Sequence, residues 1–101
     1  MTGYTVVFHA DTAIDYNEAY QWYEQQQAGL GEKYLDAVNS MVQQILTNPE
    51  IFSVKSRSGY HEAIVKNFPC TIVYRINKKQ KTVFIASVHH QKKHPRSKYR
   101  R

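Results

Sequence analysis

Residues able to carry protons and bind anions are concentrated toward the carboxyl end of this 101-residue chain. An apolar run at 82–90 ends in two adjacent histidines and leads into the basic segment 91–101. Histidine titrates near neutral pH and can donate or accept a proton, while lysine and arginine stabilise negative charge. This end of the chain therefore predicts acid–base chemistry on an anion, or the binding of one. The side chains that could take part are His61, Arg75, His89, His90 and Lys93.

The distribution of charge supports an anionic partner. Fourteen Lys and Arg against eight Asp and Glu give a formal net charge of +6. Residues 1–54 hold seven of the acids and a single lysine, whereas residues 55–101 hold thirteen Lys and Arg and one acid. An asymmetry of this kind favours a polyanion or an acidic protein as the partner of the second half.

Length and composition indicate one domain spanning residues 1–101. No apolar stretch approaches the roughly 20 residues needed to cross a bilayer, and the first residues do not resemble a signal peptide. The single cysteine, Cys70, cannot form an intramolecular disulfide, which fits a reducing compartment. We therefore expect a soluble, cytoplasmic protein with no membrane partner.

Two helices are expected in the first half of the chain, after a short strand at 4–9. Asp11 or Thr12 can cap the first helix, and Gly29 and then Asn48-Pro49 supply the breaks that end the two helices. The first helix has one apolar side at helical spacing, formed by Ala13, Tyr16, Ala19, Tyr20 and Tyr23. The second has a broader apolar stripe, formed by Leu30, Tyr34, Ala37, Val38, Met41, Val42 and Ile45.

The second half has the composition of β-structure, with runs at 60–66, 70–76 and 82–90 separated by short connections. Short connections favour antiparallel neighbours. The expected fold is α+β with the order β-α-α-β-β-β, in which a helical hairpin packs on one face of a small, mostly antiparallel sheet. Since successive strand residues face opposite ways, His89 and His90 should not both point into one site.

Four segments together resemble the RelE/ParE superfamily of toxins from type II toxin–antitoxin systems, particularly its ParE-like plasmid stabilisation branch. They are WYEQQQAGLGEKYLDAV at 22–38, NPEIF at 48–52, VKNFPCTIVYRI at 65–76 and VHHQKKHP at 88–95. Two positions depart from the family pattern. His61 occupies a place where many relatives have arginine, and Lys93 replaces the arginine of a terminal His-x-x-Arg-x-Pro motif that begins at His90. Neither lysine nor histidine reproduces the permanent charge and bidentate geometry of arginine.

The resemblance implies a toxin that is neutralised by a small acidic antitoxin and that needs no cofactor. RelE-like relatives cut mRNA on the ribosome without a metal, and ParE-like relatives inhibit DNA gyrase by binding it. A nuclease would use His61, His90 and Lys93 as its catalytic groups, and the family match favours His90 over His89. RNA or a protein partner would be bound by Lys66, Arg75, Lys92, Arg96, Lys98, Tyr99, Arg100 and Arg101, with Tyr60 as a further aromatic candidate.

Three functional hypotheses remain open at the level of sequence. The chain is a metal-independent endoribonuclease, a gyrase inhibitor, or a catalytically degenerate relative that only binds antitoxin or RNA; whether it is an enzyme is not decided. A zinc site at His90 and His94 is disfavoured, because the segment leaves a strand toward proline and two lysines lie between the histidines. No metal is therefore expected, and a homodimer is compatible with the sequence.

Overall fold

A computed structural model describes residues 3–52 and 59–90 of the chain. The helices and strands follow the expected order, β-α-α-β-β-β, with one short 3₁₀ turn after the second helix. They are β1 (Thr5–Phe8), α1 (Thr12–Gln26), α2 (Leu30–Thr47), η1 (Pro49–Ile51), β2 (His61–Ile64), β3 (Cys70–Asn77) and β4 (Thr82–His90). Within this described part, neither helix is long and apolar enough to cross a membrane.

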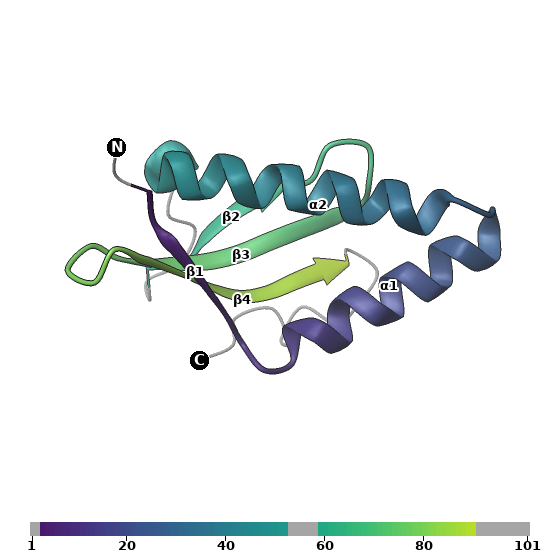
Figure 1. Cartoon of the computed structure of the whole chain (residues 1–101), viewed down its shortest axis with the longest axis horizontal. Helices are drawn as coiled ribbons and strands as arrows, with labels where there is room; N and C mark the ends of the chain where they lie inside the picture. The colour runs from purple at the N-terminus through teal and green to yellow at the C-terminus, as the bar shows by residue number, and fades with distance from the viewer. Residues whose placement is uncertain (1–2, 53–58, 91–101) are drawn as a thin grey trace.

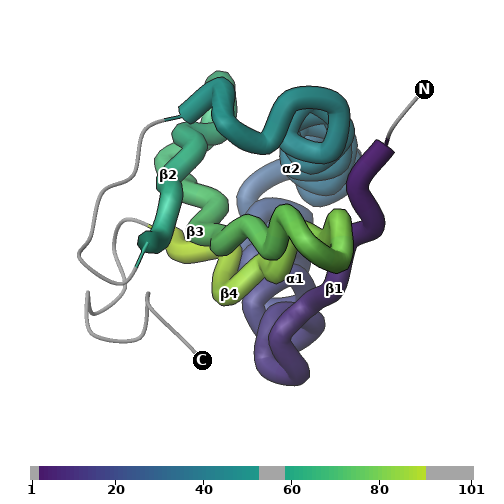
Figure 2. The backbone as a smooth tube through the Cα atoms, turned by 90° about the vertical axis from the view of Figure 1, so that its left-hand side faces the viewer, coloured from purple at the N-terminus to yellow at the C-terminus, as the bar shows by residue number. Residues whose placement is uncertain are grey.

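The four strands form one mixed sheet with the spatial order β1-β4-β3-β2. The last three strands pair antiparallel, whereas β1 lies parallel to β4, so the first and last strands of the chain are neighbours. The connection between α1 and α2 lies at one end of the molecule, and the β3–β4 hairpin lies at the other (Figure 1). In the view along the strands, both helices lie to one side of β2 and β3 (Figure 2).

The core fills the space between the helical hairpin and the sheet. The apolar stripe predicted for the second helix is confirmed, since Tyr34, Val38 and Ile45 are fully buried against strand residues such as Ile72 and Ile85. Gly29 lies in the connection between the helices with φ of +88°, a conformation that favours glycine. The helices therefore turn back on each other where the sequence predicted.

Two predictions about local structure were wrong in detail. Ala13, expected on the buried side of the first helix, is exposed, whereas the polar Thr12 and Asp15 are buried there. The physical reason is that these two side chains bond backbone groups of β4. The first strand after the helices is also shorter than the expected 60–66, because the chain turns where the Val65 N–H bonds the Cys70 carbonyl.

The buried cysteine gives a direct test of this packing. Cys70 is 1% exposed, and burial raises the pKa of its thiol from 9.0 to about 12. Because the thiolate is the reactive form, we expect the folded protein at pH 8 to react with a thiol reagent such as DTNB only as fast as it unfolds. The same protein in guanidinium chloride should react within the mixing time. Rapid labelling of the folded protein would contradict the packing described here.

Candidate functional site

The face of the sheet opposite the helices, called here the outer face, is defined by alternation along the strands. Its members are Thr5, Val7, Glu62, Ile64, Thr71, Val73, Arg75, Asn77, Thr82, Phe84, Ala86, Ser87 and His89. Arg75 is the only lysine or arginine among the described strand residues of this face. Among the described residues, the centre of the outer face is thus not lined by several cations.

An extra residue in β4 decides which of the two histidines belongs to which face. Tyr74 pairs with Ile85 and Val73 pairs with Ser87, so β4 carries one extra residue, at Ala86, relative to β3. Such a β-bulge reverses the alternation beyond it. As a result Val88 joins the main core, and His90 points toward the helices. His89 lies on the outer face opposite Thr71.

The first turn of α1 holds both sides of this bulge. The Asp15 carboxylate accepts a hydrogen bond from the Val88 N–H, with Oδ2 and N 3.2 Å apart. The Thr12 hydroxyl donates to the Ile85 carbonyl at 3.4 Å. Both residues are buried: Thr12 is fully buried, and Asp15 is 6% exposed. We call this pair the bulge clamp, because it supplies partners for backbone groups on either side of the extra residue.

His90 ends β4 inside a cluster of aromatic rings. Its Nε2 lies 3.3 Å from the Tyr23 hydroxyl, and its ring centroid lies 6.1 Å from that of Trp22. Tyr23 in turn packs edge-to-face on Phe68, with centroids 5.1 Å apart. Trp22 is 45% exposed. A partly buried histidine beside an exposed indole could exchange a proton with a ligand that stacks on the tryptophan.

His61 has a different environment, which explains its presence without any ligand. It is 8% exposed and lies flat against Tyr74, with ring centroids 5.0 Å apart and an interplanar angle of 14°. Its Nδ1 is 2.7 Å from the Phe52 carbonyl. Because a carbonyl can only accept, Nδ1 carries the proton. His61 is therefore a packed, hydrogen-bonded histidine and not an exposed strand residue.

The two histidines proposed as catalytic partners are not brought together. His61 is level with Tyr74, and His90 is level with Cys70, so they are four residues apart along the sheet and two strands apart across it. At about 3.3 Å per residue and 4.8 Å per strand, their Cα atoms are separated by roughly 16 Å. His61 and His90 therefore do not meet across adjacent strands, and Arg75 does not lie beside them, because it faces the other way.

The remaining candidate residues divide into two groups. Of the described ones, Lys66 is exposed in the β2–β3 turn, and Arg75 is exposed with its guanidinium 5.4 Å from the centroid of the Tyr60 ring. Tyr60 itself is 2% exposed, which does not suit the base-stacking role considered for it. The others lie outside the described residues, namely Lys92, Lys93, His94, Arg96, Lys98, Tyr99, Arg100 and Arg101.

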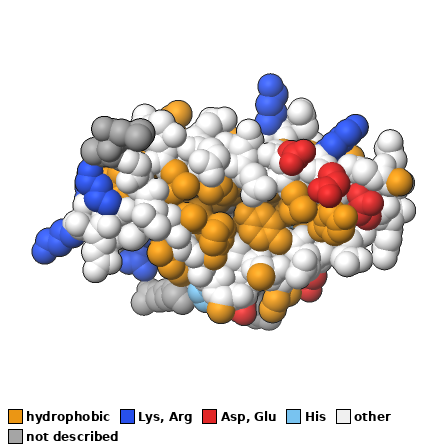
Figure 3. Space-filling view, in the orientation of Figure 1, with side chains coloured by type: hydrophobic (Ala, Val, Ile, Leu, Met, Phe, Trp, Pro, Cys, Tyr) orange, Lys and Arg blue, Asp and Glu red, His pale blue; other side chains and the backbone are white. Residues whose placement is uncertain are grey.

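Four of the six lysines and arginines among the described residues gather around the β3–β4 hairpin. Arg75, Lys78, Lys79 and Lys81 lie within seven positions of one another, whereas α1 and α2 carry five acids and one lysine. Figure 3 shows blue side chains at the hairpin end, and a red group with further blue side chains beside it toward the helix connection. Within residues 3–52 and 59–90, no three histidine, cysteine or acidic side chains are grouped so that they could hold a metal ion.

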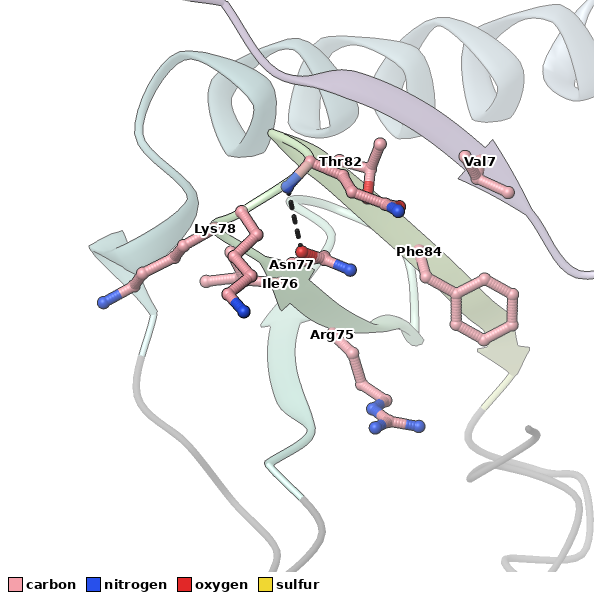
Figure 4. A pocket seen from close by; sticks show the side chains of 9 residues that line it. Val7, Arg75, Ile76, Asn77, Lys78, Thr82 and Phe84 are labelled. Atoms are coloured by element: carbon pink, nitrogen blue, oxygen red, sulfur yellow. Dashed lines mark hydrogen bonds between the residues drawn. The ribbon is translucent and has the colours of Figure 1, made fainter.

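A shallow groove of about 510 Å³ lies at this basic end (Figure 4). Val7, Phe84 and Arg75 are direct cross-strand neighbours on β1, β4 and β3. Val7 and Phe84 form the floor of the groove, and Arg75 and the hairpin residues Lys78 and Lys79 lie at its rim. Sequence reasoning found Arg75 but missed this groove, since nothing in the sequence indicated that the strand at 4–9 pairs with the last one.

Comparison with protein families gives one match that spans most of the chain. Residues 6–95 match the family described as ParE toxin of type II toxin–antitoxin system, parDE. A search of curated proteins gave no significant match.

Solved structures with a similar fold include two toxin–antitoxin systems and a free toxin. The chromosomal ParDE system from P. aeruginosa aligns with a TM-score of 0.65 at 18% identity, over 86% of this chain and 95% of that chain. The complex RelBE2 from Mycobacterium tuberculosis gives 0.65 at 22% identity, over 89% and 93%. A mutant of E. coli toxin RelE in the free state gives 0.63 at 15% identity, over 90% and 86%. At these identities the likeness shows a shared fold.

Proposed function

Because the chain belongs to the ParE toxin family of type II toxin–antitoxin systems, we propose that it arrests growth by binding DNA gyrase and that it does not cut RNA. The observation that carries this proposal is the separation of the candidate proton carriers. Metal-free RNA cleavage needs an acid, a base and phosphate-binding cations around one bond. His61 and His90 are instead two strands apart, and His61 is bonded to the Phe52 carbonyl.

The electrostatics of the outer face also favour a binding role. Positions that could face a scissile phosphate along the centre of this face carry Glu62, Thr71 and Val73. Four of the six lysines and arginines among the described residues lie at the hairpin end, where they can contact a protein surface without positioning a reaction. We further propose that a cognate acidic antitoxin neutralises the toxin, as expected from charge complementarity with a chain of net charge +6.

Ribosome-dependent mRNA cleavage is the second candidate, and the position of His90 favours it. This histidine is partly buried beside the exposed Trp22, and it directly precedes the basic segment 91–101, which contains Lys93. If His90 were a proton carrier in such a reaction, its replacement by alanine would lower cleavage by about 100- to 10,000-fold.

The two candidates predict different results for the purified protein and its His90→Ala and Lys93→Ala variants. A gyrase inhibitor should block supercoiling of relaxed plasmid, and both variants should retain most of that inhibition. In cells, induction without antitoxin should leave mRNA intact while DNA damage signalling rises. Normal supercoiling together with cut mRNA, and loss of cutting in either variant, would establish the second candidate. Absence of growth arrest on induction would exclude both and indicate a degenerate relative.

A further inference from the structure

The groove at the β3–β4 hairpin combines an apolar floor with a cationic rim. Val7 is 46% exposed although it is aliphatic, and its neighbour Phe84 is only partly buried. The two side chains lie next to each other through the pairing of β1 with β4. Arg75 follows as the next residue across the sheet. One row of residues across three strands thus presents an aliphatic, an aromatic and a cationic side chain on the outer face.

The cations of the rim are not equivalent. Lys78 is held 3.1 Å from the Glu50 carboxylate, and the Lys81 ammonium lies over the Tyr4 ring at 5.7 Å. Arg75 is placed over Tyr60, and a guanidinium in that position keeps its N–H groups available for a carboxylate. Lys79 is exposed on the hairpin. The two cations best placed to bind a ligand in the groove are therefore Arg75 and Lys79.

We propose that this hairpin groove is the docking site for an acidic segment of the cognate antitoxin, with an apolar side chain on Val7 and Phe84 and carboxylates on Arg75 and Lys79. The inference rests on the proposed toxin function and names the place where neutralisation occurs. An acidic peptide fits the groove because its carboxylates match the rim and one apolar side chain would cover the exposed floor.

A nucleic acid fits the same groove less well. Nucleic-acid sites combine a track of cations with ring faces that are open for base stacking. Here one of the lysines is already paired with Glu50, and an aliphatic side chain, Val7, occupies the most exposed part of the floor. Oligonucleotide binding is therefore an outcome that the test must be able to detect.

Binding can be measured directly with a fluorescein-labelled acidic peptide. The probe has about ten residues, roughly 33 Å when extended, with aspartates and glutamates around a leucine–phenylalanine pair. We expect Arg75→Glu and Lys79→Glu to weaken its binding by about ten- to a hundredfold, because each replaces an attractive contact by a repulsive one. Val7→Ser should weaken it with no change in the dependence on salt.

The matched control is Lys33→Glu, which makes the same charge change at an exposed position on α2. It should bind the peptide like the parent protein. Equal weakening by Lys33→Glu would show that only net charge matters and would overturn the proposal. Preferential binding of a single-stranded oligonucleotide of equal charge, lost in the same variants, would overturn it in favour of a nucleic-acid site.

Co-expression separates this inference from the proposed function. Both Arg75→Glu and Lys79→Glu should arrest growth like the parent when expressed alone, but a cognate antitoxin that rescues the parent should no longer rescue them. Full rescue of both variants would overturn the docking site while leaving the toxin function intact. Loss of growth arrest in variants that remain folded would assign the groove to the target and overturn the proposal. If the parent protein itself caused no arrest, the toxin function would fail, and peptide binding would still test the groove.

Discussion

Replacing Asp15 with alanine is expected to lower the free energy of unfolding by about 2–3 kcal/mol, because it leaves the buried Val88 N–H without its acceptor. A hydrogen bond to a carboxylate is stronger than one between neutral groups. Water does not readily replace the lost acceptor, because Val88 is only 3% exposed. Chemical unfolding in urea, followed by circular dichroism, measures this loss.

Two substitutions separate the bulge clamp from the general effect of an acid near a helix start. Asp15→Asn keeps an acceptor oxygen and should recover much of the lost stability. Asp11 is an exposed acid just before α1, and its side chain makes no capping hydrogen bond. Asp11→Ala should therefore lower the free energy of unfolding by well under about 1 kcal/mol. Similar losses for Asp11→Ala and Asp15→Ala would show that the acid acts through the helix dipole and not through Val88.

The clamp also has a consequence for the histidines. Asp15 bonds the residue two positions before His90, so loosening the bulge should disturb the contact between the His90 ring and the Tyr23 hydroxyl. In NMR spectra of the histidine side chains, Asp15→Ala should shift the His90 ring signals and leave those of His61 nearly unchanged. Equal shifts of both histidines would indicate general loosening of the fold and would contradict a local role for the clamp.

The helical hairpin could be predicted because each of its signals is local. The stripe from Tyr34 to Ile45 repeats at helical spacing, and Gly29 and Pro49 stand at the breaks. The antiparallel pairing of the last three strands also followed from the short connections between them. These features depend on neighbouring residues, and the sequence contains them explicitly.

The pairing of the first strand and the bulge in the last could not be predicted in the same way. Val7 and Phe84 are direct neighbours in the sheet although 77 positions separate them in the chain. In β4, the apolar run gives no sign that Ala86 is an extra residue, and a shift of one position moves every following side chain to the other face. The identity of the histidine that faces the helices therefore depended on a long-range contact from Asp15.

The sequence named the candidate site residues by their type, and the structure shows the surroundings of those that it describes. Lysines and arginines are concentrated in the second half of the sequence, and Arg75 is exposed. His61 was selected because histidine is a frequent proton carrier, yet its hydrogen bond to the Phe52 carbonyl and its contact with Tyr74 are packing interactions. Residue type alone does not distinguish these two uses of an imidazole.

Truncating Tyr34 to alanine should be among the most destabilising single changes, at about 3–5 kcal/mol of unfolding free energy. The side chain is fully buried, and its ring lies 5.2 Å from that of Tyr23 and 5.7 Å from that of Phe68. Removing it leaves a cavity between α2 and the sheet that the surrounding rings cannot fill without moving. For a domain of this size, such a loss is a large part of the total stability.

The hydroxyl and the ring of Tyr34 can be tested separately. Burial raises the pKa of this tyrosine, and its hydroxyl is hydrogen-bonded to the Cys70 thiol. Tyr34→Phe keeps the ring and removes only that bond, so it should cost about 1 kcal/mol. Tyr34 contacts Tyr23, and Tyr23 contacts both His90 and Trp22. The alanine variant should therefore also loosen the packing of Trp22, which would be seen as a red shift of tryptophan fluorescence in the folded protein. A loss below about 1 kcal/mol for Tyr34→Ala, a size typical of surface positions, would mean that these rings do not hold α2 on the sheet.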